Sequence, residues 1–183
     1  MNKLTIYTDG GARNNPGPAG IGVVLYDENK EIIETYKEYI GEATNNQAEY
    51  KALIKGLELT QDYIDSRRSL PAGEIPASAG MTKEGGNDKK GRGNGKIKSG
   101  HNPRAFERYG ASKGVEISCF LDSELVVKQL NKEYKVKDPG IRELYNQVLD
   151  LVIFKNVSFS HVRREQNKLA DKLVNEAIDE AKK

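Results

Sequence analysis

The sequence contains no tryptophan, a single cysteine and no long apolar run. No segment approaches the ~20 consecutive apolar residues of a membrane-spanning helix. The N-terminus enters a strand-like segment within a few residues, without a charged and then apolar leader. We therefore expect a soluble, cytoplasmic protein that does not contact a membrane. Cys119 lies inside the apolar run 115–121, which favours a buried reduced thiol over a disulfide or a nucleophile.

Net charge is also small, at +2 over 183 residues, but it is unevenly distributed. Residues 66–114 carry 11 lysine and arginine residues against four acidic ones, and they hold 10 of the 18 glycines without apolar periodicity. The rest of the chain is therefore mildly acidic. A structureless stretch of this length is uncommon inside a compact domain. We expect one domain spanning 1–183, whose core at 1–65 and 115–183 is interrupted by a flexible insertion.

Apolar patterning in the core predicts three strands, a helix, a strand, two helices, a strand and a final helix. The strands fall at 4–9, 19–26, 32–40, 115–121 and 157–162, and the helices at 44–63, 124–134, 139–152 and 166–181. Three consecutive strands followed by βα units predict an α/β fold with a five-stranded mixed sheet, three strands antiparallel and two parallel, flanked by helices.

Local signals support the helix starts and predict buried positions. Thr44 and Gln47 have the spacing of a capping box, and Asp138 before Pro139 supplies an N-cap and a first-turn proline. Helical spacing predicts that the helix at 124–134 and the final helix bury Leu125, Val126, Leu130, Leu169, Leu173, Val174 and Ala177.

Four acidic residues hold comparable positions in this topology. Asp9 and Asp122 end strands, Glu49 lies in the first turn of a helix, and Asp171 lies in the final helix. In open α/β sheets, sites form at the carboxyl ends of strands. Four carboxylates can hold two Mg²⁺ ions about 4 Å apart, a separation used in phosphodiester chemistry. Taken alone, Asp9 and its glycines are equally typical of a hairpin turn, and Glu49 of a helix-dipole partner.

The motifs around these acids, in this order, resemble those of type 1 ribonucleases H. They are YTDGG at 7–11, NPGP at 15–18, TNNQAE at 44–49, LDS at 121–123, and His161 ten residues before Asp171. The resemblance extends over the chain except the insertion. Because the chain lacks tryptophan and a basic helix-and-loop projection after Asp122, it is similar to the compact members of the family, and weaker intrinsic substrate affinity follows.

The resemblance implies a ribonuclease H-like fold and endonucleolytic hydrolysis of the RNA strand of RNA–DNA hybrids, leaving 5′-phosphate and 3′-hydroxyl ends. It implies that the four acids bind two Mg²⁺ ions, for which Mn²⁺ can substitute, and that one ion activates water while the other stabilises the leaving oxygen. We expect a monomer without an obligate protein partner. The matching catalytic and metal-binding residues are Asp9, Glu49, Asp122 and Asp171, with His161 as an auxiliary catalytic residue, and the substrate-binding ones are Gly10, Gly11, Asn15, Thr44 and Asn45.

Other interpretations stay open. The main alternative is a hybrid-binding module with little or no catalysis. Another keeps the fold and metals but acts on double-stranded RNA or a DNA junction, although the asparagine and glycine motifs favour the hybrid. His161 alone would be typical of a structural residue, and its spacing to Asp171 favours a functional one. Arg164 and Asn167 lie between them, and the sequence assigns them no role. The insertion suits a solvated loop, which we favour, or a tethered phosphate-binding arm.

Overall fold

A computed structural model of the chain describes residues 3–68, 114–153 and 156–182. The expected order of strands and helices is confirmed, with one short 3-10 helix added before the last helix. The elements are β1 (Lys3–Ala12), β2 (Gly17–Tyr26), β3 (Ile32–Ala43), α1 (Asn45–Arg68), β4 (Glu116–Leu121), α3 (Glu124–Leu130), α4 (Pro139–Val152), β5 (Asn156–His161), η1 (Arg164–Gln166) and α5 (Lys168–Glu180).

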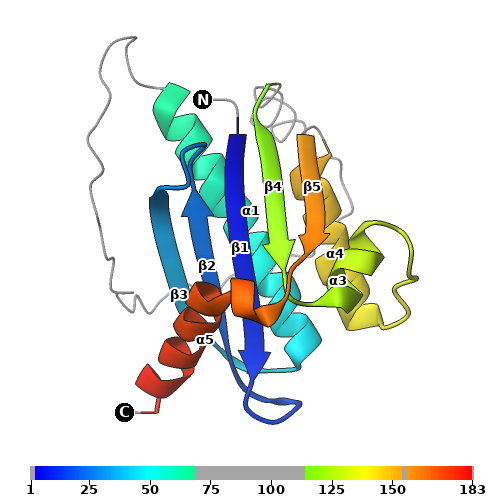
Figure 1. The fold of residues 1–183 in the computed structure, drawn as a ribbon. Coiled ribbons are helices and arrows are strands. Elements are labelled where there is room, and N and C mark those ends of the chain that lie inside the picture. Colours follow the sequence, from blue (N-terminus) through cyan, green and yellow to red (C-terminus); the bar gives the residue numbers. More distant parts are fainter. Residues whose placement is uncertain (1–2, 69–113, 154–155, 183) are drawn as a thin grey trace, which may run out of the picture.

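The five strands form one mixed sheet in the order β3-β2-β1-β4-β5. β1 pairs antiparallel with β2, as β2 does with β3, whereas β4 pairs parallel with both β1 and β5. Helix α1 packs against β1, β2 and α4, and α5 packs against β2, β3 and β1. Figure 1 shows α1 and α4 behind the sheet and α5 in front of it. The predicted α/β class and its three-plus-two strand arrangement are confirmed.

The main core lies between the sheet and α1. Leu4 and Ile6 of β1 are fully buried there with Leu53 and Leu57 of α1. Tyr50 is also fully buried, and its hydroxyl donates a 2.9 Å hydrogen bond to Oε1 of Gln129. Burial of such side chains is the main favourable contribution to folding, at roughly 25 cal/mol per Å² of apolar surface. Cys119 is a buried reduced thiol, as expected.

Strand β1 is longer than predicted. Its parallel pairing with β4 ends at Thr8 and Leu121, but its antiparallel pairing with β2 continues to Ala12. Asp9 therefore lies inside the strand, not at its end. The hairpin interpretation of the two glycines after Asp9 is also wrong, because the turn between β1 and β2 follows Ala12 and is closed by a 2.8 Å hydrogen bond from Arg13 N to Pro18 O.

Helix boundaries and buried faces also differ from the prediction. α1 continues to Arg68, and α3 ends at Leu130, where Asn131 caps it and Lys132 has a positive φ of 65°. Leu125 and Leu169 were predicted to be buried and are exposed. The buried positions are Val126, Val127, Gln129 and Leu130 in α3 and Ala170, Val174, Ala177 and Ile178 in α5.

The long connection leaves from the end of the sheet opposite the acids. α1 begins near the carboxyl end of β1 and ends at Arg68, beside the amino ends of β1 and β4 (Figure 1). Residues 66–68 of the proposed insertion are helical. Residues 69–113, to which the loop and phosphate-binding-arm interpretations apply, lie outside the described residues. Among the described helices, none is both long and apolar enough to cross a membrane.

Candidate active site

The parallel register of the central strands brings two acids together. Thr8 pairs with Leu121 in the last parallel pair of β1 and β4. The next residue of each strand is an acid, Asp9 and Asp122. Because parallel strands keep equivalent residues side by side, the register alone sets these two carboxylates next to each other at the carboxyl edge of the pairing.

Glu49 reaches the same place because α1 packs directly on β1. A Cβ on Gly10 would lie 2.1 Å from the carbonyl carbon of Ala48 and 2.3 Å from the backbone N of Glu49. Only glycine permits so close an approach of strand and helix. Glu49 is the fifth residue of α1 and no acid lies in its first turn, so the prediction of a first-turn position is wrong. A helix-dipole role therefore does not explain Glu49.

The start of α1 is fixed by side-chain hydrogen bonds. The backbone N of Thr44 donates to Oε1 of Gln47 at 2.9 Å, and the backbone N of Gln47 donates to Oγ1 of Thr44 at 3.3 Å, which confirms the predicted capping box. Oδ1 of Asn45 accepts from the backbone N of Ala12 at 2.8 Å, and Oδ1 of Asn15 accepts from the backbone N of Asn45 at 3.1 Å. These bonds tie the end of β1 and the following turn to α1.

Asp9, Glu49 and Asp122 form a cluster in which, among the described residues, no lysine or arginine makes an ion pair with any of the three. One carboxylate oxygen from each lies within 4.8 Å of the other two. Burial, and then repulsion from Asp122 and Asp171, raises the pKa of Asp9 from 3.8 to about 7. Burial, and then Asp9 and Asp122, raises the pKa of Glu49 well above its usual value. Oε2 of Glu49 is buried without a hydrogen-bond partner.

This donor set fits a hard divalent cation. Such ions take oxygen ligands, and carboxylates are the strongest of these in proteins. A cation between the three groups would remove their mutual repulsion and would give the unpartnered oxygen of Glu49 a ligand. The cluster is therefore compatible with a divalent metal ion held by Asp9, Glu49 and Asp122.

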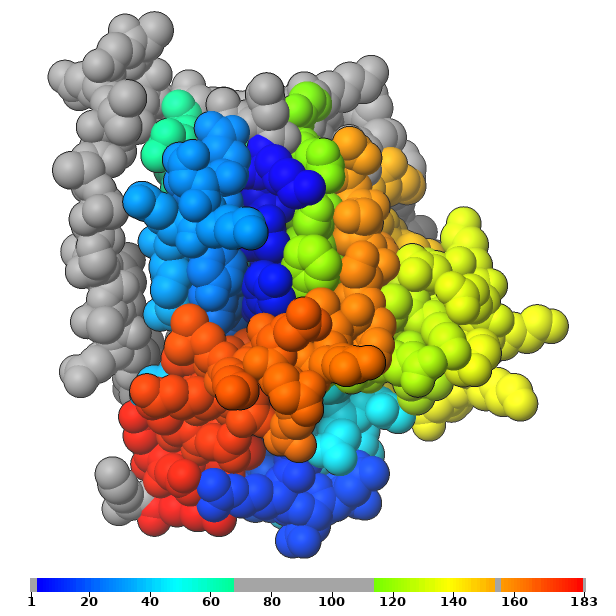
Figure 2. Space-filling model, viewed as in Figure 1, coloured from blue at the N-terminus to red at the C-terminus, as the bar shows by residue number. Residues whose placement is uncertain are grey.

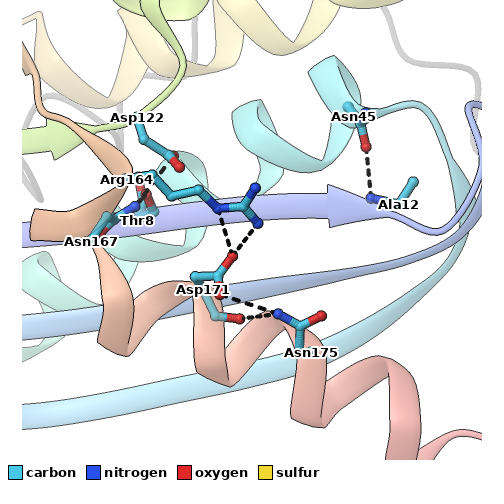
Figure 3. A network of polar contacts seen from close by, with 8 residues as sticks. All are labelled: Thr8, Ala12, Asn45, Asp122, Arg164, Asn167, Asp171 and Asn175. Atoms are coloured by element: carbon cyan, nitrogen blue, oxygen red, sulfur yellow. Dashed lines mark hydrogen bonds and ion pairs between the residues drawn. The ribbon is translucent and has the colours of Figure 1, made fainter.

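Asp171 is arranged differently and is not part of this cluster. Its Oδ1 accepts hydrogen bonds from Nη2 and Nε of Arg164 at 2.5 and 3.2 Å. Its Oδ2 accepts a 3.3 Å hydrogen bond from Nδ2 of Asn175, which also donates to the Asp171 backbone carbonyl. Figure 3 shows Asp171 between these two side chains. The acid lines the same pocket as the cluster, but its carboxylate is already paired.

Asn167 is a part of the site that the sequence did not reveal. Its side chain is buried, and Nδ2 donates to the backbone carbonyl of Thr8 at 2.9 Å and to Oδ1 of Asp122 at 3.3 Å. It therefore connects the start of α5 to both central strands (Figure 3). The available signal was an asparagine directly before the final helix, a position that is also typical of an ordinary N-cap.

These groups line one open pocket of about 340 Å³. In Figure 2 the orange start of α5 and the blue turn between β1 and β2 border this part of the surface. Of the predicted substrate residues, Asn45, Gly10 and Gly11 line the pocket, and Asn15 and Thr44 lie at its border through their bonds to α1. The lining residues are Asp9, Gly10, Gly11, Ala12, Arg13, Asn45, Glu49, Asp122, Arg164, Asp171, Val174, Asn175 and Ile178.

His161 does not line this pocket. It is exposed at the end of β5, where it pairs with Leu121, the residue before Asp122. Its charge lowers the pKa of Glu124, after the larger effect of the Lys128 hydrogen bond and charge on that carboxyl. His161 is thus one strand away from the acids, on the side that faces α3.

A larger groove of about 470 Å³ lies on the open face of the sheet, beside Tyr7, Tyr26 and Phe120. Tyr7 stacks on Phe120 with ring centroids 5.0 Å apart. The groove shares no lining residue with the acid pocket, and no acidic residue lines it. Its size therefore does not make it the site of the chemistry.

Solved structures of other proteins resemble this chain over its whole length. LC11-RNase H1, isolated from compost, has 37% identity and a TM-score of 0.72, and the match covers 100% of both chains. The same enzyme in complex with an RNA/DNA hybrid matches 98% of this chain at 35% identity, with a TM-score of 0.69. RNase H1 of Halobacterium salinarum has 30% identity, a TM-score of 0.67, and coverage of 97% of this chain and 98% of its own.

Sequence comparisons agree. The RNase H family model matches residues 1–68, and a model described as reverse transcriptase-like matches residues 113–177. The curated ribonuclease HI of Halobacterium salinarum is 33% identical over 98% of this chain and 66% of its own length. A bifunctional protein of Mycobacterium tuberculosis is 32% identical over 98% of this chain, but the chain spans only 36% of that relative's length.

The fold and the site together define an α/β protein with a carboxylate cluster, suited to divalent cations, at the carboxyl edge of its parallel strands. Within that class the chain belongs to the type 1 ribonuclease H family. The predicted family and its ribonuclease H-like fold are confirmed.

Proposed function

We propose that this protein hydrolyses the RNA strand of RNA–DNA hybrids as an endonuclease, leaving 5′-phosphate and 3′-hydroxyl ends. The observation that carries the proposal is the cluster of Asp9, Glu49 and Asp122, whose oxygens lie within 4.8 Å of one another beside an open pocket. The family supports the activity, and the hybrid bound by LC11-RNase H1 supports the substrate.

We propose that Asp9, Glu49 and Asp122 hold divalent cations, with Asp171 completing the set, and that the ions are Mg²⁺, for which Mn²⁺ substitutes. Two such ions, when bound, stabilise the attacking and the leaving oxygens of a phosphodiester. The protein's contribution is a rigid placement of its carboxylates. Gly10 lets α1 carry Glu49 up to β1, and Asn167 holds Asp122 by a hydrogen bond from α5.

The substrate contacts that we propose surround this cluster. Asn45 lines the pocket with its backbone N held by Asn15, so both side chains are oriented before substrate binds. Such preorganisation lowers the entropic cost of binding a phosphate backbone. Thr44, Gly10 and Gly11 complete the proposed contact set. His161, exposed at the end of β5, is accessible to solvent and substrate and suits an auxiliary role in proton transfer.

The domain organisation is part of the proposal. One ribonuclease H domain would consist of a core at 1–65 and 115–183 with an insertion at 66–114. Its connection leaves the sheet opposite the acids, so an insertion there need not obstruct the pocket. We propose that the domain acts as a monomer in the cytoplasm.

The test is cleavage of an end-labelled RNA–DNA hybrid by the purified full chain with Mg²⁺ or Mn²⁺, beside RNA–RNA and DNA–DNA duplexes. Asp9→Asn removes one carboxylate of the cluster, and Asp150→Asn makes the same change on the exposed side of α4 as a matched control. We expect cleavage of the hybrid only, abolished by Asp9→Asn and unchanged by Asp150→Asn. Binding of hybrid without cleavage under either metal would support a non-catalytic binding module instead, and preferential cleavage of RNA–RNA would reassign the substrate.

A further inference from the structure

The pocket contains a positively charged group that faces the acids. Arg164 and Arg13 are the basic residues of its lining. Arg13 is engaged elsewhere, because its Nη2 lies 2.7 Å from Oδ1 of Asp179. Arg164 instead binds Oδ1 of Asp171, and its charge also interacts with Asp9 and Asp122. Among the described residues that line the pocket, Arg164 is therefore the basic group that acts on its acids.

Arg164 and Asn175 together leave Asp171 with no oxygen that is free of a hydrogen bond. Arg164 occupies Oδ1 through two nitrogens, and Asn175 occupies Oδ2. The other three acids form their cluster without Asp171. The site as it stands thus offers one complete set of carboxylates to a cation, whereas the fourth acid is held by a guanidinium.

We propose that Arg164 is an exchangeable counter-cation, which binds Asp171 in the substrate-free protein and releases it when a substrate phosphate takes the guanidinium. Asp171 then becomes available to a divalent cation only after the nucleic acid has bound. Arg164 is a positioning residue in this scheme, since it acts through Asp171. The inference rests on the proposed function, because it assumes that the cluster binds cations.

Exposure and chemistry both favour such an exchange. The Arg164 side chain is 74% exposed and that of Asp171 is 28% exposed, so the guanidinium can move into solvent without breaking a packed core. An exposed ion pair of this kind contributes little to stability. The planar guanidinium matches a phosphate as well as a carboxylate, with the same two-nitrogen geometry. A doubly charged ion is in turn a stronger partner for Asp171 than a single positive charge.

A purely structural pair would have different consequences. It would fix the start of α5, and its loss would change stability and, through the lost charge near Asp9 and Asp122, the affinity of the first cation, but it would add no second cation site. The exchange predicts a second site, because removing the arginine frees the Asp171 carboxylate beside an existing cation site. The number of cations bound by the substrate-free protein therefore distinguishes the two without any measurement of cleavage.

The test is Mn²⁺ binding to the substrate-free full chain at neutral pH, followed by the loss of the free-ion electron paramagnetic resonance signal. Arg164→Gln removes the charge, and Arg163→Gln makes the same change at the adjacent exposed residue, which lies outside the pocket lining. We expect wild type and Arg163→Gln to bind Mn²⁺ alike. We expect Arg164→Gln to bind a second Mn²⁺ ion that wild type and Arg163→Gln do not bind.

Binding of the same number of Mn²⁺ ions by wild type and Arg164→Gln would overturn the exchange while leaving the proposed cation site intact. Failure of wild type and of both variants to bind Mn²⁺ at millimolar concentration would overturn the cation site and the exchange with it. A second measurement checks the phosphate step: the dependence of log affinity for the RNA–DNA hybrid on log salt concentration. The magnitude of its slope should decrease by about 1 in Arg164→Gln and should not change in Arg163→Gln. An unchanged slope in Arg164→Gln would contradict that step.

Discussion

The acidic pocket has two parts, the cluster of Asp9, Glu49 and Asp122 and the separate Asp171, and they differ in how their negative charge is compensated. Asp9 on β1, Glu49 on α1 and the partly buried Asp122 directly after β4 lie close together, and burial, followed by repulsion from Asp122 and Asp171, raises the pKa of Asp9 to about 7. Asp171 lies at the half-exposed start of α5 and is neutralised by Arg164. The carboxylates of the cluster repel one another, and a bound cation would relieve this repulsion. The charge of Asp171 is instead compensated by Arg164 of the same chain.

This difference indicates which part is built for an external ion. A buried carboxylate cluster is costly unless something compensates it, and Gly10 and Asn167 show how the fold supports that arrangement. An exposed acid with its own arginine needs no ion. We therefore expect the primary cation site at the cluster and a secondary, dependent role for Asp171.

The comparison predicts unequal losses of activity. Asp9→Asn removes a carboxylate from the primary cation site. Loss of a residue that only orients a metal ligand lowers metal affinity or activity by about 10–100-fold. Loss of the ligand itself should therefore lower kcat/KM by at least about 100-fold. Asp171→Asn should retain more activity than Asp9→Asn. Steady-state cleavage of a hybrid checks both. A larger loss with Asp171→Asn would reverse the assignment of primary and secondary roles.

Asn167 and Asn175 provide a second contrast, because each holds an acid of one part. Asn167→Ala frees Asp122 and leaves the Thr8 carbonyl without its donor, so we expect a loss of about 10–100-fold in activity and about 1–3 kcal/mol in stability. Asn175→Ala, at an exposed position, should change activity by less than about tenfold. Activity assays together with urea unfolding separate the two effects, and equal behaviour of the variants would contradict the contrast.

Gly10 and Gly11 are adjacent in β1 but face different neighbours. A Cβ at Gly10 would meet the α1 backbone at 2.1 Å, whereas one at Gly11 would lie an ordinary 3.4 Å from Cγ1 of Val174. Gly10→Ala should therefore destabilise the protein by about 1–3 kcal/mol through displacement of α1, and Gly11→Ala should have an effect within about 0.5 kcal/mol. Chemical unfolding measures both. Similar stability of the two variants would show that α1 does not press on β1.

The pH dependence of stability should reveal how much the ionisation of Asp9 destabilises the folded protein. A carboxyl whose pKa rises from 3.8 to about 7 on folding binds its proton more tightly in the folded state, so its contribution to stability is lost as pH rises from about 4 to about 7. Without metal, wild type should lose more than about 1 kcal/mol over this range relative to Asp9→Asn.

Thermal unfolding at several pH values measures that difference. Addition of Mg²⁺ at pH 7.5 should stabilise wild type more than Asp9→Asn, because the ion binds the ionised cluster. A wild type whose stability relative to the variant does not change with pH would show that burial and the neighbouring acids do not raise the pKa of Asp9.

The sequence was sufficient for the order of elements and the mixed sheet, because apolar periodicity and motif spacing are local signals, and three of the four acids that it singled out lie together in the structure. It was not sufficient for the face that α5 buries. Gly22 has no side chain, and the backbone of Ala170 packs directly against it: a Cβ on Gly22 would lie 2.3 Å from the Ala170 carbonyl oxygen. The face of α5 that contains Ala170 is therefore buried, and Leu169 is exposed. Periodicity alone cannot choose between two neighbouring apolar stripes.

The partners of the acids were likewise beyond the sequence. The contact of Asn167 with Asp122 and the ion pair of Arg164 with Asp171 depend on how α5 docks against β2, β3 and β1. The position of Glu49 depends on the close contact at Gly10, not on its place in a helix turn. Tertiary packing sets these contacts, and no short motif records it.

The most direct test of the account is a crystal of the substrate-free protein equilibrated with Mn²⁺ near pH 7.5, examined by anomalous scattering. We predict a Mn²⁺ peak between the carboxylates of Asp9, Glu49 and Asp122, with Arg164 still bound to Asp171. No peak at the cluster, or a peak at Asp171 with the three carboxylates of the cluster unchanged, would contradict the claim that these three acids form the primary cation site.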